Sequence, residues 1–176
     1  MRRGLAAAGL EAEPALVDAI LRTYLDVLGD EVARAAAFRV LPGVGALLRR
    51  VAGEAGVAVG LGTGNLRRGA ELKLARAGLD AHFAFGGFGC DHEDRAELLR
   101  IGAARGAARL GVDVEDCRIV VVGDTPRDVA AARAIDAACV AVGTSGVTLD
   151  VLRAAGAAHV FADLTDPGVP AALTGA

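Results

Sequence analysis

The sequence predicts an α/β protein with a doubly wound parallel sheet, and three observations support this prediction. Helical and strand-like segments alternate along the chain after residue 41, as they do in β-α-β units. The strand-like segments are apolar throughout, which is typical of strands that helices cover on both faces. Hydrophobic residues make up 53% of the 176 residues and charged residues only 23%, so the chain can bury a core of this kind.

The N-terminal residues predict helical structure that precedes the sheet. Apolar residues recur at helical spacing behind Pro14, a residue that the first turn of a helix tolerates, and Gly29 is the expected end of this helix. The sequence Leu41-Pro42-Gly43 is typical of a joint between two modules. We therefore expect a helical module over residues 1–40 and an α/β module over residues 41–176.

The helices expected in the α/β module have apolar residues at helical spacing, and several have a capping residue or a terminal glycine. With these caps they cover residues 44–51, 66–77, 94–110, 126–134 and 148–156. The expected strands are short apolar runs at residues 57–61, 81–85, 118–122, 139–142 and 159–162. Open parallel sheets bind ligands beyond the carboxyl ends of their strands. The polar residues that follow the first and the third strand are therefore the candidates for a functional site.

Two aspartates follow the third strand. Asp124 lies just beyond it, and Asp128 falls in the first turn of the next helix. Carboxylates in this position can hold Mg²⁺, which takes one or two carboxylates together with waters and phosphate oxygens. A structural alternative is that Asp124 caps the helix and Asp128 interacts with the helix dipole. The spacing alone leaves both interpretations open.

Thr63 lies between two glycines at the end of the first strand. Its hydroxyl and the backbone N–H groups of Gly64 and Asn65 form a plausible phosphate cradle. The pattern Gly60-x-Gly62-x-Gly64 also resembles the turn that binds S-adenosylmethionine in methyltransferases, so a methyltransferase-like domain remains an alternative. The dinucleotide-binding fingerprint does not fit, because its third glycine would fall on Asn65.

Arg95 stands at the start of the long helix that follows a glycine-rich stretch. A cation is unfavourable there, because the helix dipole already places positive charge at the N-terminus. Neutralising a phosphate or a carboxylate would explain the residue. The alternative is a solvated surface arginine, since Lys73 is the only lysine among 19 basic residues and arginine is therefore abundant.

Composition argues against several other classes of protein. The net charge of -3 gives no sign of the basic face that nucleic-acid binding usually needs. The three cysteines form no CxxC pair, and the three histidines have no partner at ligand spacing, which argues against a disulfide framework or a zinc site. No signal peptide and no apolar run of about 20 residues is visible, so we expect a cytoplasmic protein without membrane contact.

Five blocks of the chain together resemble the haloacid dehalogenase-like (HAD) hydrolase superfamily, close to its phosphoglycolate-phosphatase-like members. They are Val59–Asn65, Glu71–Leu79, Phe85–Gly89, Asp94–Leu98 and Val122–Asp128. The resemblance covers about residues 40–165 and implies a Rossmann-like core, with residues 1–40 as part of an N-terminal helical cap. It also implies a Mg²⁺-dependent hydrolase that acts on a small phosphorylated metabolite.

The resemblance implies a role for four residues. Thr63 would hydrogen-bond the transferring phosphoryl group, together with the turn at Gly64 and Asn65. Arg95 would neutralise the phosphate and orient the nucleophile. Asp124 would bind Mg²⁺, and Asp128 would be the outer carboxylate of the same motif.

One motif of the superfamily is missing from this sequence. The superfamily has Asp-x-Asp after its first strand, where it supplies the nucleophile and the general acid. Asp113 and Asp116 lie before a strand, and Asp163 and Asp166 have two residues between them, so neither pair matches. We expect a HAD core without its first strand, and an N-terminally truncated, inactive copy of a phosphatase. The alternative is a non-catalytic phosphate-binding or regulatory protein. A smaller departure is Asp136, near which the superfamily usually has a glycine.

Overall fold

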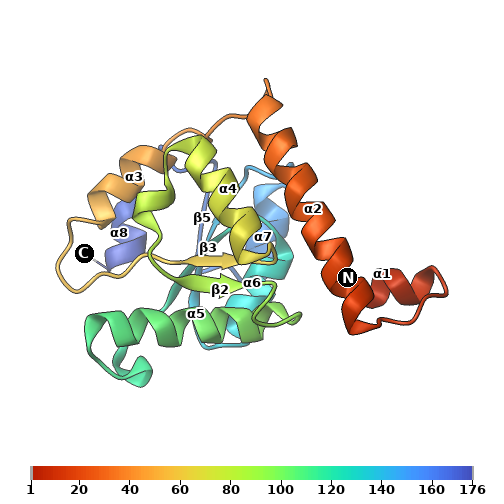
Figure 1. Ribbon diagram of the computed structural model, residues 1–176. Helices are drawn as coiled ribbons and strands as arrows, with labels where there is room; N and C mark the ends of the chain where they lie inside the picture. The colour runs from red at the N-terminus through yellow and green to blue at the C-terminus, as the bar shows by residue number, and fades with distance from the viewer. Residues whose placement is uncertain (1, 176) are drawn as a thin grey trace.

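The computed structural model describes residues 2–175 and has the expected α/β architecture (Figure 1). The helices are α1 (Arg2–Ala7), α2 (Pro14–Arg34), α3 (Val44–Val51), α4 (Arg67–Ala77), α5 (Arg95–Leu110), α6 (Pro126–Arg133), α7 (Leu149–Ala154) and α8 (Val169–Thr174). The strands are β1 (Leu61–Thr63), β2 (Gly86–Phe88), β3 (Val120–Gly123), β4 (Ala138–Val142) and β5 (His159–Phe161). Two 3₁₀ turns, η1 (Asp80–His82) and η2 (Val114–Asp116), precede β2 and β3.

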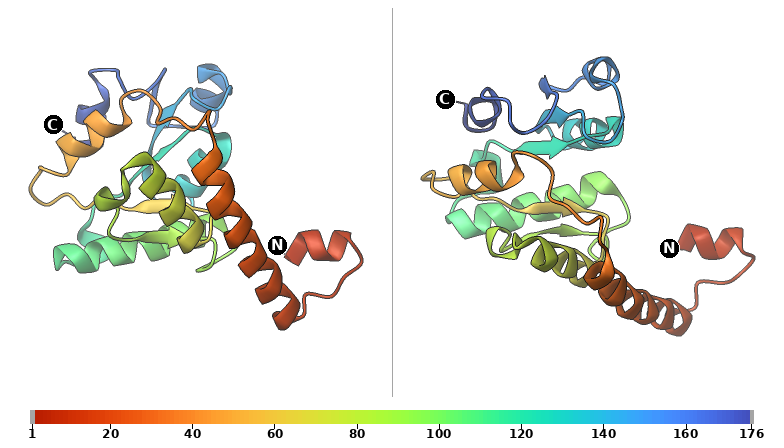
Figure 2. Two further views of the ribbon diagram at one scale, coloured as in Figure 1. Left: turned by 45° about the horizontal axis from the view of Figure 1, so that its top comes forward. Right: turned by 90° about the horizontal axis from the view of Figure 1, so that it is seen from above.

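Every strand pair is parallel, but the strands form two separate sheets. β1 pairs with β2, whereas β4 lies between β3 and β5. Within residues 2–175, no strand pairs with the second edge of β1 or of β3. Val122 of β3 is 44% exposed, whereas Val140 of the central strand β4 is fully buried. Figure 2 shows the two sheets as two parts of the molecule that lie side by side.

Helices cover both faces of the three-stranded sheet. One buried cluster joins α6 and α7 to Cys139 and Ala141 of β4, and Val160 packs against it. A second cluster joins α3 and α8, and Phe161 packs against that one. Because neighbouring residues of a strand point to opposite faces, Val160 and Phe161 show that the two clusters lie on opposite sides.

The two-stranded sheet lies directly against α5. A Cβ atom at Gly87 would lie 1.7 Å from the carbonyl oxygen of Leu98, so only glycine allows this approach of helix and strand. The predicted strand at 81–85 is wrong, because that segment overlaps η1 and the strand is the glycine-rich Gly86–Phe88. The first strand is also displaced, from residues 57–61 to Leu61–Thr63, because it forms a ladder only where the short β2 is available.

Several local predictions are confirmed. Asp94 accepts hydrogen bonds from the N–H groups of Ala96 and Glu97 and so caps α5, while Gly78 and Gly111 end α4 and α5 in the left-handed conformation. Asp136 has a φ of 55°, a left-handed conformation that favours glycine.

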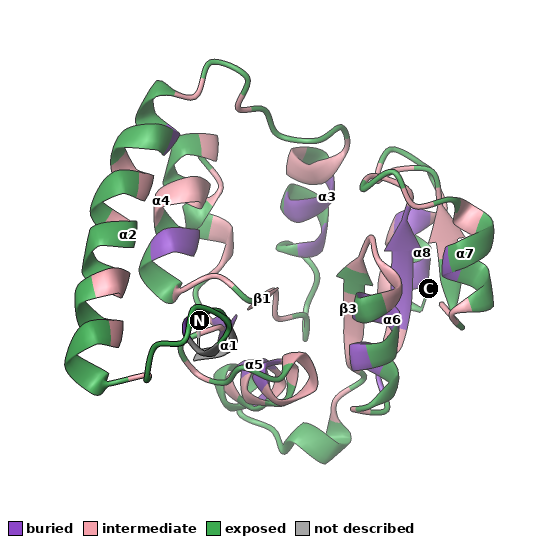
Figure 3. Cartoon of the chain, turned by 90° about the vertical axis from the view of Figure 1, so that its right-hand side faces the viewer, coloured by how far each residue is buried: buried purple, intermediate pink, exposed green. Residues whose placement is uncertain are grey.

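The N-terminal helices extend from one side of the molecule. The predicted end of α2 at Gly29 is wrong, because the helix continues to Arg34 and packs against α4. Figure 3 shows most of α2 as exposed, and Val32 is its one buried residue. The division into modules at residue 40 stays a prediction, and Met1 and Ala176 lie outside the described residues. No described helix is both long enough and apolar enough to cross a membrane.

Candidate functional site

Asp128 is the most deeply buried polar residue of the site, with 4% of the residue exposed. Its Oδ2 accepts hydrogen bonds from the N–H of Asp124 (3.1 Å), the N–H of Thr125 (3.0 Å) and the hydroxyl of Thr125 (2.8 Å). Thr125 and Asp128 thereby form a capping box at the start of α6. A Cβ atom at Gly123 would lie 2.3 Å from the Cβ of Asp128, so glycine is needed for the carboxylate to fold back.

Arg95 reaches this carboxylate from the start of α5, the helix that packs on the two-stranded sheet. Its guanidinium forms an ion pair with Oδ1 of Asp128, and the Arg95 side chain is 40% exposed. The Nε of Arg95 is buried and has no hydrogen-bond partner among the described residues. Arg95 is therefore not the freely solvated surface residue of the alternative interpretation, because it neutralises a buried carboxylate and has a buried N–H without a partner among the described residues.

The surroundings of Asp128 keep its carboxylate charged. Burial alone would raise the pKa of Asp128, but the hydrogen bond from Thr125, the charge of Arg95 and two backbone N–H groups outweigh burial. The pKa of Asp128 is consequently held below its usual value. Oδ2 accepts three hydrogen bonds and Oδ1 pairs with Arg95, so this side chain orients Arg95 and caps α6.

Asp124 is oriented by residues that follow β4. Its Oδ2 accepts a hydrogen bond from the hydroxyl of Thr144 (3.1 Å), and its carbonyl oxygen accepts one from the hydroxyl of Ser145 (2.6 Å). The N-cap of α6 is Thr125, so the alternative that Asp124 caps this helix is wrong. Thr144 and Ser145 were not predicted, although the rule of strand carboxyl ends also applies to the end of β4.

Of the two aspartates, Asp124 has the carboxylate that is more open to a magnesium ion. Oδ1 of Asp124 has no hydrogen-bond partner among the described side chains, whereas Oδ2 of Asp128 accepts three hydrogen bonds and its Oδ1 pairs with Arg95. No cluster of three potential metal ligands occurs among the described side chains. Because Mg²⁺ often takes only one or two carboxylates and completes its shell with waters and phosphate oxygens, Asp124 fits as a single protein ligand.

Thr63 ends β1 and is held by its own loop. Its Oγ1 accepts hydrogen bonds from the backbone N–H of Asn65 (3.1 Å) and from Nδ2 of Asn65 (2.8 Å). We expected this backbone N–H to face an anion, but in the structure it is used inside the loop. Nζ of Lys73, on α4, donates to Oδ1 of Asn65 (3.0 Å), a contact that was not predicted. Gly64 is exposed, and no hydrogen bond from its N–H to another described residue is found.

The loops after β1 and β2 lie against each other. The N–H of Gly89 donates to the carbonyl of Asn65 (2.9 Å), and a Cβ atom at Gly89 would lie 2.1 Å from the carbonyl oxygen of Gly64. The second loop leads directly to Arg95. Among the described residues, no hydrogen bond or ion pair joins Thr63 to Arg95 or to Asp124. The structure thus brings Arg95 and Asp128 into contact and links Thr63 to them only through the loops.

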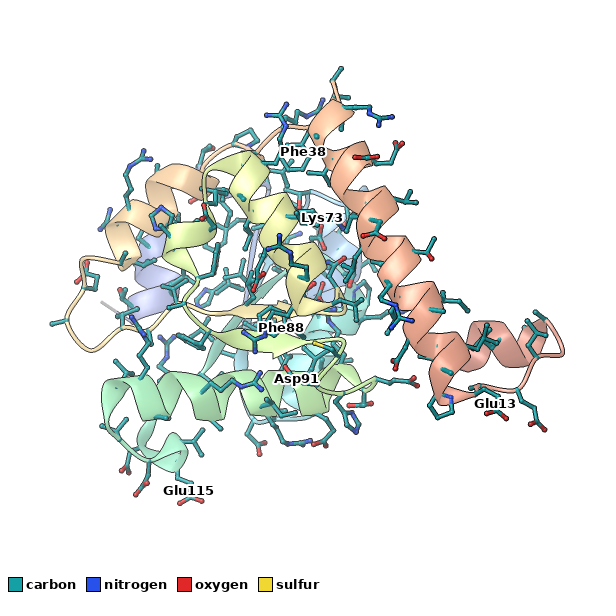
Figure 4. The ribbon with its side chains drawn as sticks, in the orientation of Figure 1. Glu13, Phe38, Lys73, Phe88, Asp91 and Glu115 are labelled. Carbon is teal, nitrogen blue, oxygen red and sulfur yellow. The ribbon has the colours of Figure 1, made fainter. Side chains whose placement is uncertain are left out.

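A second ion pair fixes the loop that leads to Arg95. Arg105 of α5 donates to both carboxylate oxygens of Asp91 (2.6 and 2.9 Å) and to the carbonyl of Gly86 (2.6 Å). The Phe88 N–H donates to the same carboxylate (2.9 Å). Arg105 is the main reason that the pKa of Asp91 falls to about 2. Figure 4 labels Asp91 and Phe88, which lie close together after β2, and it also labels Lys73 of α4. Nothing in the spacing of Asp91 and Arg105 indicated this pair.

The glycines before Thr63 are explained by packing. A Cβ atom at Gly60 would lie 2.3 Å from the ring of Phe85, and one at Gly62 would lie 2.4 Å from the side chain of Leu99. These two glycines therefore bring side chains close to β1. The structure gives no independent support to the S-adenosylmethionine alternative, which rested on their spacing.

Comparison with known proteins decides the family. The family model described as haloacid dehalogenase-like hydrolase matches residues 4–136, well over half of the chain. The chain belongs to this family. As a HAD-like hydrolase it has the α/β fold with parallel sheets that its sequence predicted. A search of curated proteins found no match.

Two solved structures share the fold of this HAD-like chain. One is a conserved haloacid dehalogenase-like protein of unknown function from Agrobacterium tumefaciens, with 22% identity and a TM-score of 0.61, covering 97% of this chain and 75% of that one. The other is a HAD family hydrolase from Deinococcus radiodurans with bound phosphate and sodium, with 22% identity and a TM-score of 0.58. That match covers 98% of this chain and 72% of the Deinococcus chain.

Proposed function

We propose that this chain carries the phosphate-binding and metal-binding residues of a Mg²⁺-dependent phosphomonoester hydrolase. The observation that carries the proposal is the buried Nε–H of Arg95, which has no partner among the described residues and lies beside the charged Asp128. A buried donor without an acceptor is costly, so a ligand oxygen is expected to satisfy it. The phosphate bound to the Deinococcus relative is consistent with an anion as that ligand.

The contacts of these side chains support the role that we propose for each. The hydroxyl of Thr63 donates a hydrogen bond to a phosphoryl oxygen, and the exposed N–H of Gly64 donates another. Arg95 neutralises the phosphoryl group, and Asp128 holds the guanidinium in place. Asp124 holds Mg²⁺, which would neutralise negative charge on the transferring group. The substrate class is a small phosphorylated metabolite, with phosphoglycolate as its representative and residues 1–40 as part of a cap that contributes selectivity.

The nucleophile is the part that we propose is missing, so that the chain alone is inactive. The sequence contains no Asp-x-Asp, and β1 and β3 each have an edge without a strand partner within residues 2–175. A strand inserted between β1 and β3 would pair with both edges and would cover Val122. We propose that such a strand, with a carboxylate at its end, belongs to the intact hydrolase.

Phosphate binding tests the first part of the proposal. Inorganic phosphate would be titrated calorimetrically into the wild-type chain in the presence of MgCl₂, and then into Arg95→Met and Arg109→Met. Because a hydrogen bond to a charged group contributes about 1.5–3 kcal/mol, Arg95→Met should bind at least about tenfold more weakly than the wild-type chain. Arg109→Met removes an equal charge from the other end of α5 and should change the affinity little. Equal affinities of all three proteins would contradict the role of Arg95.

Turnover of p-nitrophenyl phosphate tests the missing nucleophile. The chain alone should show no Mg²⁺-dependent turnover. Fusing an N-terminal strand with Asp-x-Asp from an active family member should create turnover that Asp124→Ala nearly abolishes. Turnover by the unmodified chain would contradict the missing nucleophile. A fusion that binds phosphate but shows no turnover would instead favour a non-catalytic phosphate-binding protein. The absence of Asp-x-Asp from the sequence is the observation that supports this alternative.

A further inference from the structure

Lys73 takes part in a chain of polar contacts that ends at the proposed phosphate site. It is the only lysine of the sequence, and it is partly buried on α4. Its Nζ donates to Oδ1 of Asn65 at 3.0 Å, and Nδ2 of Asn65 donates to Oγ1 of Thr63 at 2.8 Å. The backbone N–H of Asn65 donates to the same Oγ1 at 3.1 Å.

The chemistry of these groups determines which of them donates and which accepts each hydrogen bond. An ammonium group can only donate hydrogen bonds, so Lys73 requires the carboxamide of Asn65 to turn its oxygen toward α4. The amide nitrogen of Asn65 must then face Thr63. A hydroxyl has two acceptor lone pairs and one proton, and both lone pairs of Thr63 are now occupied. What remains is the O–H of Thr63 as a donor toward a ligand.

We propose that Lys73 is a positioning residue, which makes Thr63 a hydrogen-bond donor toward an anion by fixing the orientation of the Asn65 amide. This inference rests on the proposed role of Thr63 in phosphate binding. Without Lys73, the amide of Asn65 can flip and present its oxygen to Thr63. The hydroxyl of Thr63 would then donate its hydrogen bond to Asn65 and could no longer donate one to the phosphate.

The direct effect of the Lys73 charge is the competing explanation. A cation near the site attracts phosphate whether or not it orients Asn65. The two explanations differ in how Lys73 and Thr63 combine. If Lys73 acts through Thr63, the losses from Lys73→Met and Thr63→Val overlap, whereas two independent contributions add.

The test combines nuclear magnetic resonance with phosphate titration of the full chain. In ¹⁵N-labelled Lys73→Met, the side-chain amide signals of Asn65 should shift or broaden, and Lys73→Arg should restore them, because arginine also only donates. The dissociation constant for inorganic phosphate should rise about five- to tenfold in Lys73→Met. Arg76→Met, which removes a charge one turn further along α4, should stay within about twofold of the wild type. The double variant Lys73→Met/Thr63→Val should bind no more weakly than Thr63→Val.

Three results would overturn the inference, namely unchanged Asn65 signals in Lys73→Met, an equal loss of affinity in Arg76→Met, and additive losses in the double variant. The failure of the proposed function looks different, because the wild-type chain itself would then not bind phosphate. In that case the Asn65 signals still decide whether Lys73 orients this amide.

Discussion

Replacing Arg105 with methionine removes the contact that holds the loop in front of Arg95. The methionine fills a similar volume but makes none of the three hydrogen bonds to Asp91 and Gly86. The carboxylate of Asp91 then keeps only the N–H of Phe88. The free energy of unfolding should fall, and by an amount that depends on pH.

The pKa of Asp91 indicates how much the free energy of unfolding should fall. It is lowered from 3.8 to about 2, with the hydrogen bond from Arg105 as the largest cause. A difference of this size corresponds to about 2.4 kcal/mol of stability at neutral pH. The Phe88 N–H keeps part of that effect, and solvent screens the pair, since Arg105 is 37% and Asp91 17% exposed. We therefore expect Arg105→Met to lose about 1–2 kcal/mol at pH 7.

The sign of the pH dependence follows from the lowered pKa. The unfolded chain binds a proton at Asp91 more readily than the folded one, so this contribution is full above about pH 5 and is lost as the pH falls from about 4 toward 2. Urea unfolding followed by far-ultraviolet circular dichroism measures it at pH 7 and at pH 3. The deficit of Arg105→Met should shrink to about half at pH 3.

Arg109→Met is the matched control for this experiment. Arg109 is an exposed arginine of the same helix, in its last turn. Its replacement should change the unfolding free energy by no more than about 0.5 kcal/mol at either pH. The reasoning is refuted if both variants lose the same stability, or if the deficit of Arg105→Met is the same at pH 7 and pH 3.

Three further substitutions test other parts of the structure. Asp128→Asn breaks the ion pair with Arg95 and should lower the free energy of unfolding by about 2–4 kcal/mol, measured by thermal or urea unfolding. An unchanged melting temperature would contradict this expectation. Gly123→Ala places a methyl group against Asp128 and should cost about 1–3 kcal/mol in the same assay, and full stability of this variant would mean that the carboxylate moves freely. Asp136→Gly relieves a left-handed backbone and should stabilise the chain by about 0.5–1 kcal/mol, whereas any loss of stability would show that the aspartate side chain has a role of its own.

The sequence predicted best what depends on a few neighbouring residues. Asp94 and Gly111 mark the ends of α5 because a cap and a left-handed residue act within one turn of the chain. β3 was found because its valines form an uninterrupted apolar run. β2 was missed because a Gly-Gly-Phe strand has little β propensity, and the reason for its glycines, the approach of α5, is a tertiary contact.

The same limit applies to the candidate site. Asp124, Asp128 and Thr63 were singled out because each lies at or near the end of a strand. The ion pair of Arg95 with Asp128 joins residues that follow different sheets, and no local pattern contains it. Lys73 is distinctive in the sequence, because it is the single lysine of an arginine-rich chain. Only the structure shows its contact with Asn65.

The division of the strands into two sheets also affects how the backbone exchanges its amide protons with solvent. β4 has a hydrogen-bonded neighbour on each side, so its amides are released only when much of its sheet opens. β1 and β3 each have one edge without a strand partner within residues 2–175, and amides on that edge need little opening to meet water. β4 should therefore be the slowest strand to exchange. Protection that arose on the open edges when another chain was added would mark the place where that chain inserts.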